Sequence, residues 1–249
     1  MKDMHNHILF SIDDGSKTIE SSIKMLKNAQ ENGIDEMILT PHYIYNSKYN
    51  ANNKKKEKLL EELKKGCKKE KIKIKLYLGN EVWADEGLPA LIKKGEIKTL
   101  NDSRYILIEF PLHNEDKRAR NIIFELVSHN YVPVIAHPER YDYLKKDPEK
   151  VKEYMELGAL LQGNYLSLLG KYGRHAKKTL KYYVKKGYIT FFGSDVHRDT
   201  EDFKCDKFKK VLWKLVKKDQ KVFDDLCFGN IAKIINNKEI KKDGMKNGK

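Results

Sequence analysis

The sequence predicts an α/β protein, a distorted TIM-like (β/α)7 barrel built as one domain over residues 1–236. Short, unbroken apolar runs alternate with stretches of helical periodicity, and such runs are typical of parallel strands buried on both faces. Polar residues that end these runs, at positions 5, 42, 81, 109, 137, 164 and 195, are separated by 37, 39, 28, 28, 27 and 31 residues. These intervals fit one strand and one helix per unit. No linker rich in Pro, Gly or Ser divides the chain, which favours one domain.

The first unit opens at the N-terminus itself. The later strands are expected at 37–39, 76–78, 105–108, 132–136, 159–161 and 188–192. Helical spacing of apolar residues predicts helices over 18–32, 54–69, 119–130, 148–157, 173–186, 204–219 and 224–236. The polar remainder, 237–249, is expected to be a disordered tail.

Composition narrows the class of protein. Hydrophobic residues make up 40% of the chain and charged residues 35%, with a net charge of +14. The charge first suggests a polyanion partner, but lysine is spread through every helical stretch and interleaved with glutamate. Solvated helix faces are therefore favoured over a nucleic-acid surface. No apolar run is long enough to span a bilayer and no signal peptide precedes the first strand, so we expect a cytoplasmic protein without membrane insertion.

The cysteines argue against thiol chemistry. Cys67, Cys205 and Cys227 are odd in number and far apart, which suits a reducing compartment and offers no zinc motif. None is followed by Arg six positions later, as the usual thiol-based phosphatase loop would require.

Residues able to bind metal end most of the apolar runs. His5 and His7 are two residues apart, so on a strand both imidazoles face the same side. Because parallel strands of a barrel end around one mouth, the others should converge there. Any one of them alone could be a solvated strand end or a loop histidine, and the inference rests on the set. The candidate ligands are His5, His7, Asp14, His42, Glu81, Glu109, His137, Asp195 and His197.

Nine imidazole and carboxylate groups exceed the needs of one ion. They predict two or three metal ions with bridging carboxylates, and such donors suit Mn²⁺, Fe²⁺ or Zn²⁺. Arg140 closely follows His137, and a guanidinium beside a metal cluster suits a phosphate substrate because it binds two oxygens at once. A surface pair between Arg140 and Glu139 is the alternative, and the sequence leaves both open.

Six segments carry a family resemblance: 3–9, 13–15, 40–42, 101–105, 137–141 and 194–197. Together they resemble the polymerase-and-histidinol-phosphatase (PHP) superfamily. Within it, the chain is most similar to the manganese-dependent bacterial protein-tyrosine phosphatases of capsule and exopolysaccharide biosynthesis, the CpsB/YwqE-like group. The resemblance runs in order over about residues 1–230. It implies the PHP fold, a distorted (β/α)7 barrel with a trinuclear metal site.

The resemblance also implies roles for individual residues. Two metal sites would use His5, His7, Glu81, Glu109, His137 and Asp195, and Asp14, His42 and His197 would complete a third. Arg140, His42 and Asp195 form the expected catalytic set. Arg140 matches the phosphate-binding Arg of the family. For the second substrate Arg, only Arg198 is available, closer to the Asp-x-His motif than the family places it.

The implied cofactor is Mn²⁺, with Fe²⁺, Zn²⁺ or Mg²⁺ as substitutes. The implied substrate is phosphotyrosine on a bacterial tyrosine kinase that regulates capsular or extracellular polysaccharide synthesis. Two alternatives remain at this point: a PHP phosphoesterase for a small substrate such as histidinol phosphate, and a nucleic-acid-processing PHP protein. No stable nucleic-acid partner is expected, and the sequence leaves the oligomeric state open.

Overall fold

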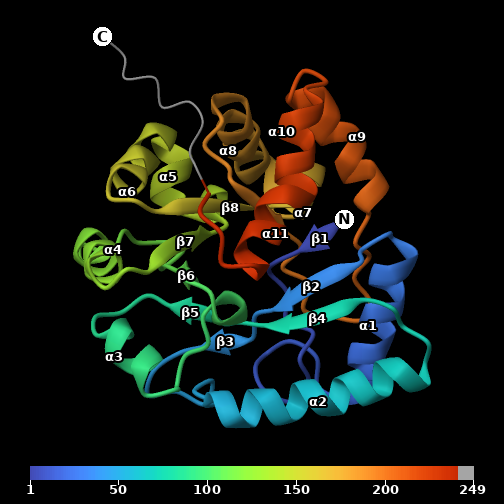
Figure 1. Cartoon of the computed structure of the whole chain (residues 1–249). Helices are drawn as coiled ribbons and strands as arrows, with labels where there is room; N and C mark the ends of the chain where they lie inside the picture. The colour runs from blue at the N-terminus through green and yellow to red at the C-terminus, as the bar shows by residue number, and fades with distance from the viewer. Residues whose placement is uncertain (241–249) are drawn as a thin grey trace.

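The strands form two parallel sheets that curl around a common axis. The computed structural model describes residues 1–240, and in this part of the chain one sheet has the order β1-β2-β4 and the other β3-β5-β6-β7-β8-β9 (Figure 1). The first contains β1 (Lys2–Asp3), β2 (Glu36–Leu39) and β4 (Lys75–Leu78). The second contains β3 (His42–Tyr43), β5 (Glu81–Trp83), β6 (Tyr105–Glu109), β7 (Val132–Ala136), β8 (Leu160–Asn164) and β9 (Phe191–Gly193).

Two of the predicted barrel strands are each interrupted once. β2 and β3 are separated only by Thr40 and Pro41, and β4 and β5 only by Gly79 and Asn80. Gly79 is needed at its break because an added Cβ would lie 2.7 Å from Leu100 Cδ2. With each interrupted pair counted as one strand, seven strands follow one another around the axis. The predicted distorted (β/α)7 barrel is confirmed.

Hydrogen bonds beyond the regular strands bring the first and last strands together. His7 N–H donates to the Val196 carbonyl at 3.0 Å, and Asp195 N–H donates to the His5 carbonyl at 2.8 Å. On the other side, Thr40 N–H donates to the Asn6 carbonyl at 3.1 Å. The N-terminal segment is thereby held between strands that are far away in sequence.

Helices cover the outside of the curled sheets (Figure 1). They are α1 (Ile19–Glu31), α2 (Asn53–Lys69), α3 (Leu88–Lys93), α4 (Ala119–Ser128), α5 (Asp142–Lys146), α6 (Lys152–Glu156), α7 (Tyr165–Leu169), α8 (Gly173–Lys186), α9 (Cys205–Leu215), α10 (Gln220–Asp224) and α11 (Asn230–Ile235). Short 3-10 turns are η1 (Leu100–Asp102), η2 (Pro138–Arg140) and η3 (Pro148–Val151), and η4 (Asp225–Gly229) is a π-helical turn.

Several predicted helices differ in detail from those observed. The predicted helix over 148–157 is a 3-10 turn, η3, followed by α6, and the predicted helix over 224–236 runs through α10, η4 and α11. Three short helices, α3, α5 and α7, were not predicted because five or six residues are too few to show a helical period. The long helices begin close to the predicted residues, with Thr18 and Asn52 as side-chain N-caps of α1 and α2.

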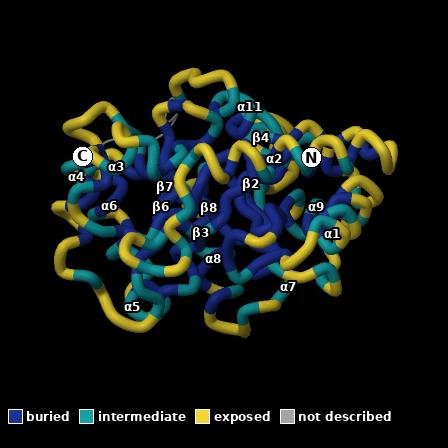
Figure 2. Tube along the Cα trace, turned by 90° about the horizontal axis from the view of Figure 1, so that it is seen from below, coloured by how far each residue is buried: buried dark blue, intermediate teal, exposed yellow. Residues whose placement is uncertain are grey.

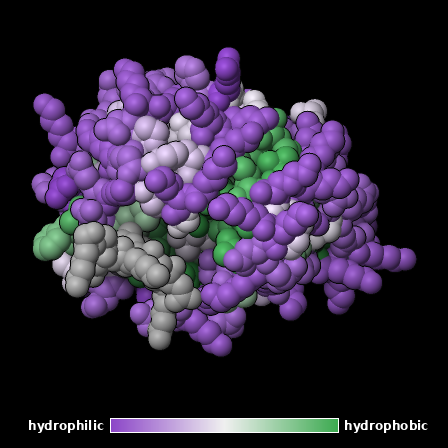
Figure 3. Space-filling model, turned by 90° about the horizontal axis from the view of Figure 1, so that it is seen from above, coloured by the Kyte–Doolittle hydropathy of each residue, from purple (hydrophilic) through white to green (hydrophobic). Residues whose placement is uncertain are grey.

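Burial explains why the strands are apolar on both faces. All five residues of β6 and all five of β8 are buried, and the strands form the dark interior in Figure 2. One apolar cluster lies between sheet and helices. A second includes Ile38 of β2, Leu107 of β6 and Met4, which follows β1, together with Ile231 and Ile234 of α11. From above, most of the surface is hydrophilic with a limited apolar strip (Figure 3).

The described end of the chain packs against the start of β6. Tyr105 Oη donates to the Lys238 carbonyl at 2.8 Å and accepts from Ile240 N–H at 3.1 Å. The predicted disordered tail therefore begins with four residues placed on the barrel, and its remainder, 241–249, lies outside the described residues. No helix within residues 1–240 combines the length and the apolar character needed to cross a bilayer.

Lys56 is a buried cation that gives the fold a pH dependence. Its side chain is 1% exposed, and Nζ donates to Asn80 Oδ1 at 2.5 Å and to the Glu96 carbonyl at 2.9 Å. Burial, helped by nearby Lys98, lowers the pKa of Lys56 to about 7. The unfolded chain keeps this proton up to a pKa of about 10.4, so the unfolded state binds more protons between these values.

The free energy of unfolding attributable to Lys56 should therefore rise with pH between about 7 and about 10, by up to about 1.4 kcal/mol per pH unit. The check is denaturant unfolding of wild type and Lys56→Met across that range, because methionine removes the titrating group and keeps most of the volume. A stability difference between the two proteins that stays constant with pH would contradict this prediction.

Candidate metal centre

All nine predicted ligands converge at the carboxyl ends of the strands, and Glu81 lies at their centre. Glu81 Oε1 is 3.2 Å from His5 Nε2 and 3.0 Å from His137 Nε2. Glu81 Oε2 is 3.2 Å from His7 Nε2 and 3.1 Å from His42 Nδ1. Each carboxylate oxygen thus faces two imidazoles, which is the arrangement of a bridging carboxylate.

Asp195 is a second point of convergence. Its Oδ1 lies 3.6 Å from His5 Nε2, 3.5 Å from His7 Nε2 and 3.5 Å from His197 Nδ1. Asp14 extends the cluster toward solvent, since its Oδ1 lies 3.7 Å from Nε2 of both His42 and His197. The His197 ring stacks on His7 with centroids 3.8 Å apart.

Three groups of donor atoms are compact enough to hold an ion. Within each, all donor atoms lie within 4.8 Å of one another: His7, Asp14, His42 and His197; His5, His7 and Glu81; and His42, Glu81 and Glu109. Because they share His7, His42 and Glu81, the groups form one continuous centre. Glu109 also approaches His137, with its Oε1 3.5 Å from Nε2.

The orientation of the imidazoles fits metal binding. His5 Nδ1 is bound to Gln162 Oε1 and His7 Nδ1 to Asp13 Oδ2, each at 2.8 Å. The opposite nitrogens, His5 Nε2 and His7 Nε2, are buried and have no hydrogen-bond partner, although carboxylate oxygens lie nearby. A ligating histidine is held in this way by its outer nitrogen, which leaves the inner lone pair free for the metal.

The charges of the cluster also call for a cation. Burial lowers the pKa of His137 and of His197 to about 4, so both imidazoles are neutral, as ligands must be. The Glu81 and Asp195 carboxylates instead raise the pKa of His5 to about 9, and Asp13 raises that of His7, so a bound ion would displace protons from these two imidazoles. Burial and the adjacent Glu81 carboxylate raise the pKa of Glu109 well above its usual value. Buried carboxylates this close cannot all be ionised without compensating positive charge. Divalent ions would supply that charge, so the residues present fit the metal site that the resemblance implies.

Arg140 lies at the edge of the cluster, anchored to a candidate ligand. Its Nη1 donates to Asp195 Oδ2 at 2.6 Å, and its guanidinium carbon stacks 4.4 Å from the centroid of the Tyr172 ring. Asp195 Oδ2 also accepts from Asn164 Nδ2 at 3.0 Å and from Tyr172 Oη at 3.3 Å. The pairing of Arg140 with Asp195 replaces the surface pair with Glu139 that the sequence left open.

Arg198 is placed differently from Arg140. It is exposed, and its Nη1 donates to the backbone carbonyls of Asp14 and Gly15. Arg198 therefore lies on the rim beside Asp14, the most exposed candidate ligand. Its side chain is near enough to the centre to remain a candidate for substrate binding.

Four residues of the site were not assigned roles from the sequence: Asp13, Gln162, Asn164 and Tyr172. Asp13 belongs to the Asp-Asp-Gly motif, and Gln162 and Asn164 end the β8 run, so their positions carried a signal of the same kind as the ligands. Tyr172 lies in the loop between α7 and α8, and nothing in the sequence marks it. Gly193 is also required, because an added Cβ would lie 2.5 Å from His5 Cβ.

Asp13 should control metal affinity through His7. Its Oδ2 accepts from His7 Nδ1 and from His42 N–H at 2.9 Å, and it is itself buried. We expect Asp13→Asn to weaken Mn²⁺ binding by roughly 10- to 100-fold, because the amide no longer fixes the tautomer of His7. Isothermal titration with Mn²⁺ measures this, with Asp206→Asn on the exposed face of α9 as the matched control. Equal affinities for the two variants would contradict the role given to Asp13.

The three cysteines offer no nucleophile. All are buried and free, and burial raises the pKa of Cys67 and Cys205 to about 11 and that of Cys227 to about 12. Thiols with such pKa values are not thiolates near neutral pH.

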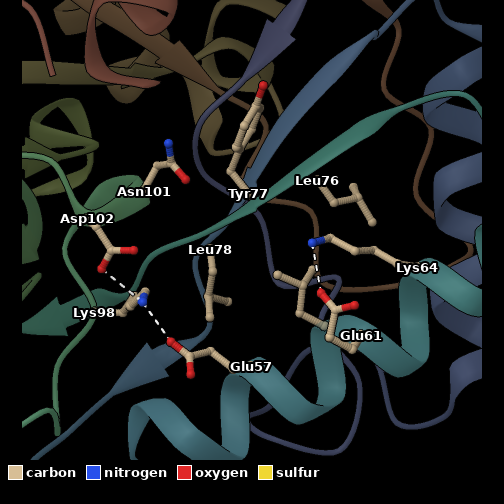
Figure 4. Close-up of a pocket in the computed structure, with 10 residues that line it drawn as sticks. Glu57, Glu61, Lys64, Leu76, Tyr77, Leu78, Lys98, Asn101 and Asp102 are labelled. Carbon is tan, nitrogen blue, oxygen red and sulfur yellow. Dashed lines mark hydrogen bonds and ion pairs between the residues drawn. The ribbon is translucent and has the colours of Figure 1, made fainter. Parts of the chain in front are cut away.

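A hollow of about 470 Å³ lies away from this centre, between α2, β4 and η1 (Figure 4). None of the nine candidate ligands lines it. Lys98 pairs with Glu57 and Asp102 and Lys64 with Glu61, so its charged groups neutralise one another. We assign it no part in the chemistry.

Comparison with known proteins identifies the family. The family model for capsular polysaccharide synthesis, CpsB/CapC, matches residues 1–236. The chain belongs to the CpsB/CapC family. This confirms the resemblance on which the sequence-based roles depend.

Individual members of the CpsB/CapC family are similar over most of their length. CapC of Staphylococcus aureus is 36% identical over 200 residues, which are 80% of this chain and 78% of CapC. The tyrosine-protein phosphatase YwqE of Bacillus subtilis is 33% identical over 215 residues, 86% of this chain and 84% of YwqE. The tyrosine-protein phosphatase CpsB of Streptococcus pneumoniae is 29% identical over 202 residues.

Solved structures agree with this assignment. A structure from the study of YwqE and CpsB as metal-dependent tyrosine phosphatases superposes with a TM-score of 0.90 at 30% identity, covering 97% of this chain and 96% of that chain. Histidinol phosphate phosphatase of Lactococcus lactis superposes with a TM-score of 0.57 at 15% identity, which shows a shared fold alone.

Proposed function

We propose that this CpsB/CapC-family chain is a metal-dependent protein-tyrosine phosphatase, a phosphoric monoester hydrolase without a cysteine nucleophile. One observation carries the proposal. Nine imidazole and carboxylate side chains share a buried centre with Arg140 at its edge, in a chain similar to YwqE and CpsB, which are named tyrosine-protein phosphatases. Phosphotyrosine combines an anionic group for such a centre with an aromatic leaving group.

The ligands for the ions are the nine residues of the centre. His5, His7, Glu81, Glu109, His137 and Asp195 lie deepest, and Asp14, His42 and His197 lie toward solvent. We propose that they hold two or three ions. Mn²⁺ is the preferred ion and Fe²⁺, Zn²⁺ or Mg²⁺ are substitutes, since the donor atoms are nitrogen and oxygen and include no thiolate. When bound, divalent ions supply charge neutralisation for phosphate oxygens and lower the pKa of water.

Arg140 is the residue that we assign to the transferring phosphoryl group. Its guanidinium forks onto two oxygens of a phosphate and neutralises charge that grows in the transition state. The Tyr172 ring below it and Asp195 beside it keep the guanidinium at the edge of the cluster. Arg198, on the rim beside Asp14, is the second residue that we assign to substrate binding.

The tyrosyl leaving group matches what the site offers. A phenol has a pKa of about 10, so a phenolate leaves with less help from an acid than an alkoxide does. His42 lies on the solvent side of the ligand cluster, with its side chain 14% exposed and beside the Tyr49 ring. It completes the catalytic set with Arg140 and Asp195.

The cellular substrate that we propose is phosphotyrosine on a bacterial tyrosine kinase that regulates capsular or extracellular polysaccharide synthesis, in the cytoplasm. Membership of the CpsB/CapC family supports this context. The deciding assay uses purified protein with Mn²⁺ and measures phosphate release from three substrates: a phosphotyrosine peptide, the same peptide with phosphoserine, and histidinol phosphate. A chelator serves as the control. Chelator-sensitive release from phosphotyrosine alone is expected. Release from histidinol phosphate alone would keep the metal centre and overturn the proposed substrate.

A further inference from the structure

One stretch of the chain, which ends with α8, is strongly basic. Between Glu156 and Asp195 the sequence contains no Asp or Glu. The same stretch contains seven basic residues: Lys171, Arg174, Lys177, Lys178, Lys181, Lys185 and Lys186. Six of them belong to α8, which is basic without a single acidic residue.

The arrangement on α8 concentrates these charges. Arg174, Lys178, Lys181 and Lys185 follow one another at helical spacing, so they form one stripe along the helix, which we call the α8 stripe. The opposite side of α8 is buried through Ala176, Leu180, Tyr183 and Val184. Among residues 1–240, no carboxylate lies within ion-pair distance of any member of the stripe.

Several lysines elsewhere on the surface are paired with carboxylates. Lys27 pairs with Glu70, Lys64 with Glu61, Lys98 with Glu57 and Lys209 with Asp206, for example. Two carboxylates near α8 are already paired, since Glu201 pairs with Lys171 and Glu149 with Lys152. α8 differs from the other long lysine-rich helix because it contains no Asp or Glu, whereas α2 carries Glu57, Glu61 and Glu62 among its lysines.

The N-terminus of α8 lies near the metal centre. α8 follows directly after Tyr172, whose Oη reaches Asp195 at 3.3 Å. It also packs against η2, which carries Arg140. A Cβ added at Gly170, in the same loop as Tyr172, would lie 4.0 Å from Lys177 Nζ. In Figure 1, α8 lies on the side of the molecule opposite to α2.

We propose that the α8 stripe binds acidic residues that flank the phosphotyrosine of a protein substrate. This deepens the proposed function and rests on it. From Arg174 to Lys185 the stripe spans 11 residues of helix, or about 16 Å at a rise of about 1.5 Å per residue. An extended peptide covers that distance in about five residues, so the acidic residues should fall within about five positions of the phosphotyrosine.

The test compares phosphotyrosine peptides that differ only in flanking charge. One peptide has three Glu among the five residues before the phosphotyrosine, one has them after it, and each has a twin with Gln instead. At about 0.05 M salt, kcat/KM for at least one Glu peptide should exceed that of its Gln twin by about tenfold. The preference should shrink at about 0.5 M salt, because exposed charges are then screened.

Two variants locate the effect. The double variant Lys178→Gln, Lys181→Gln should lose the preference for Glu peptides. The double variant Lys65→Gln, Lys68→Gln, on the exposed side of α2, removes the same amount of charge and should retain that preference. Turnover of p-nitrophenyl phosphate, which has no flanking residues, should be unchanged in both variants and reports on folding and on the metal centre.

Equal turnover of Glu and Gln peptides, or a preference that survives in the α8 variant, would overturn the proposal. A third result would also overturn it: the protein binds vesicles rich in phosphatidylserine through Lys178 and Lys181 and shows no preference between the peptides. The stripe would then bind a membrane surface. Failure to hydrolyse any phosphotyrosine peptide would instead count against the proposed function itself.

Discussion

Replacing Glu81 with Gln should abolish phosphotyrosine hydrolysis at saturating Mn²⁺. Both oxygens of Glu81 face pairs of imidazoles at 3.0–3.2 Å, and the side chain is 1% exposed. Glutamine keeps the size of the side chain but removes its charge and leaves one oxygen in place of two. The loss in kcat should exceed the roughly 10- to 100-fold that is typical for a residue that only supports a ligand.

The same change should reduce the number of ions that the protein retains. Metal content after dialysis, measured together with kcat on a phosphotyrosine peptide, separates loss of ions from loss of folding. Glu61→Gln, at an exposed position on α2, is the matched control and should keep both values. Wild-type kcat in Glu81→Gln would show that the centre does not depend on this carboxylate.

Arg140→Lys should lower kcat/KM by about 10²- to 10³-fold, the usual effect of losing one fixed donor to a transition state. Lysine keeps the positive charge but cannot fork onto two phosphate oxygens or stack on Tyr172 as the guanidinium does at 4.4 Å. Inorganic phosphate should also bind the variant more weakly, which isothermal titration measures without turnover.

Arg120→Lys is the control for this substitution, because Arg120 is exposed and pairs with Glu153 on the outer helices. It should leave kcat, KM and phosphate affinity at wild-type values. If Arg140→Lys binds phosphate as the wild type does, Arg140 serves the structure around Asp195 and does not contact the substrate.

The convergence of ligands could be predicted from the sequence because it follows from a single rule about barrels. Glu81, Glu109 and His137 each end an apolar run, and the carboxyl ends of parallel strands meet at one mouth. The rule predicts that these side chains lie near one another, but it does not predict which of them are in contact. It could not tell that Glu81 lies between two pairs of imidazoles, or that Arg140 pairs with Asp195 across 55 residues of sequence.

What the sequence could not predict depends on long-range packing. The break between β4 and β5 is tied to Leu100, which packs against Gly79 from a turn about 20 residues away. Tyr172 enters the site because the short helix α7, capped by Asn164, turns the chain back toward Asp195. Neither feature leaves a periodic pattern, whereas the long helices α1, α2 and α8 do.

Phosphotyrosine hydrolysis should depend on a centre of more than one metal ion. The most direct test adds Mn²⁺ in measured equivalents to chelator-treated protein and follows hydrolysis of a phosphotyrosine peptide. We predict no activity without metal and a rise that levels off at two or three equivalents per chain. Full activity in the chelated protein, or a plateau at one equivalent, would contradict the account.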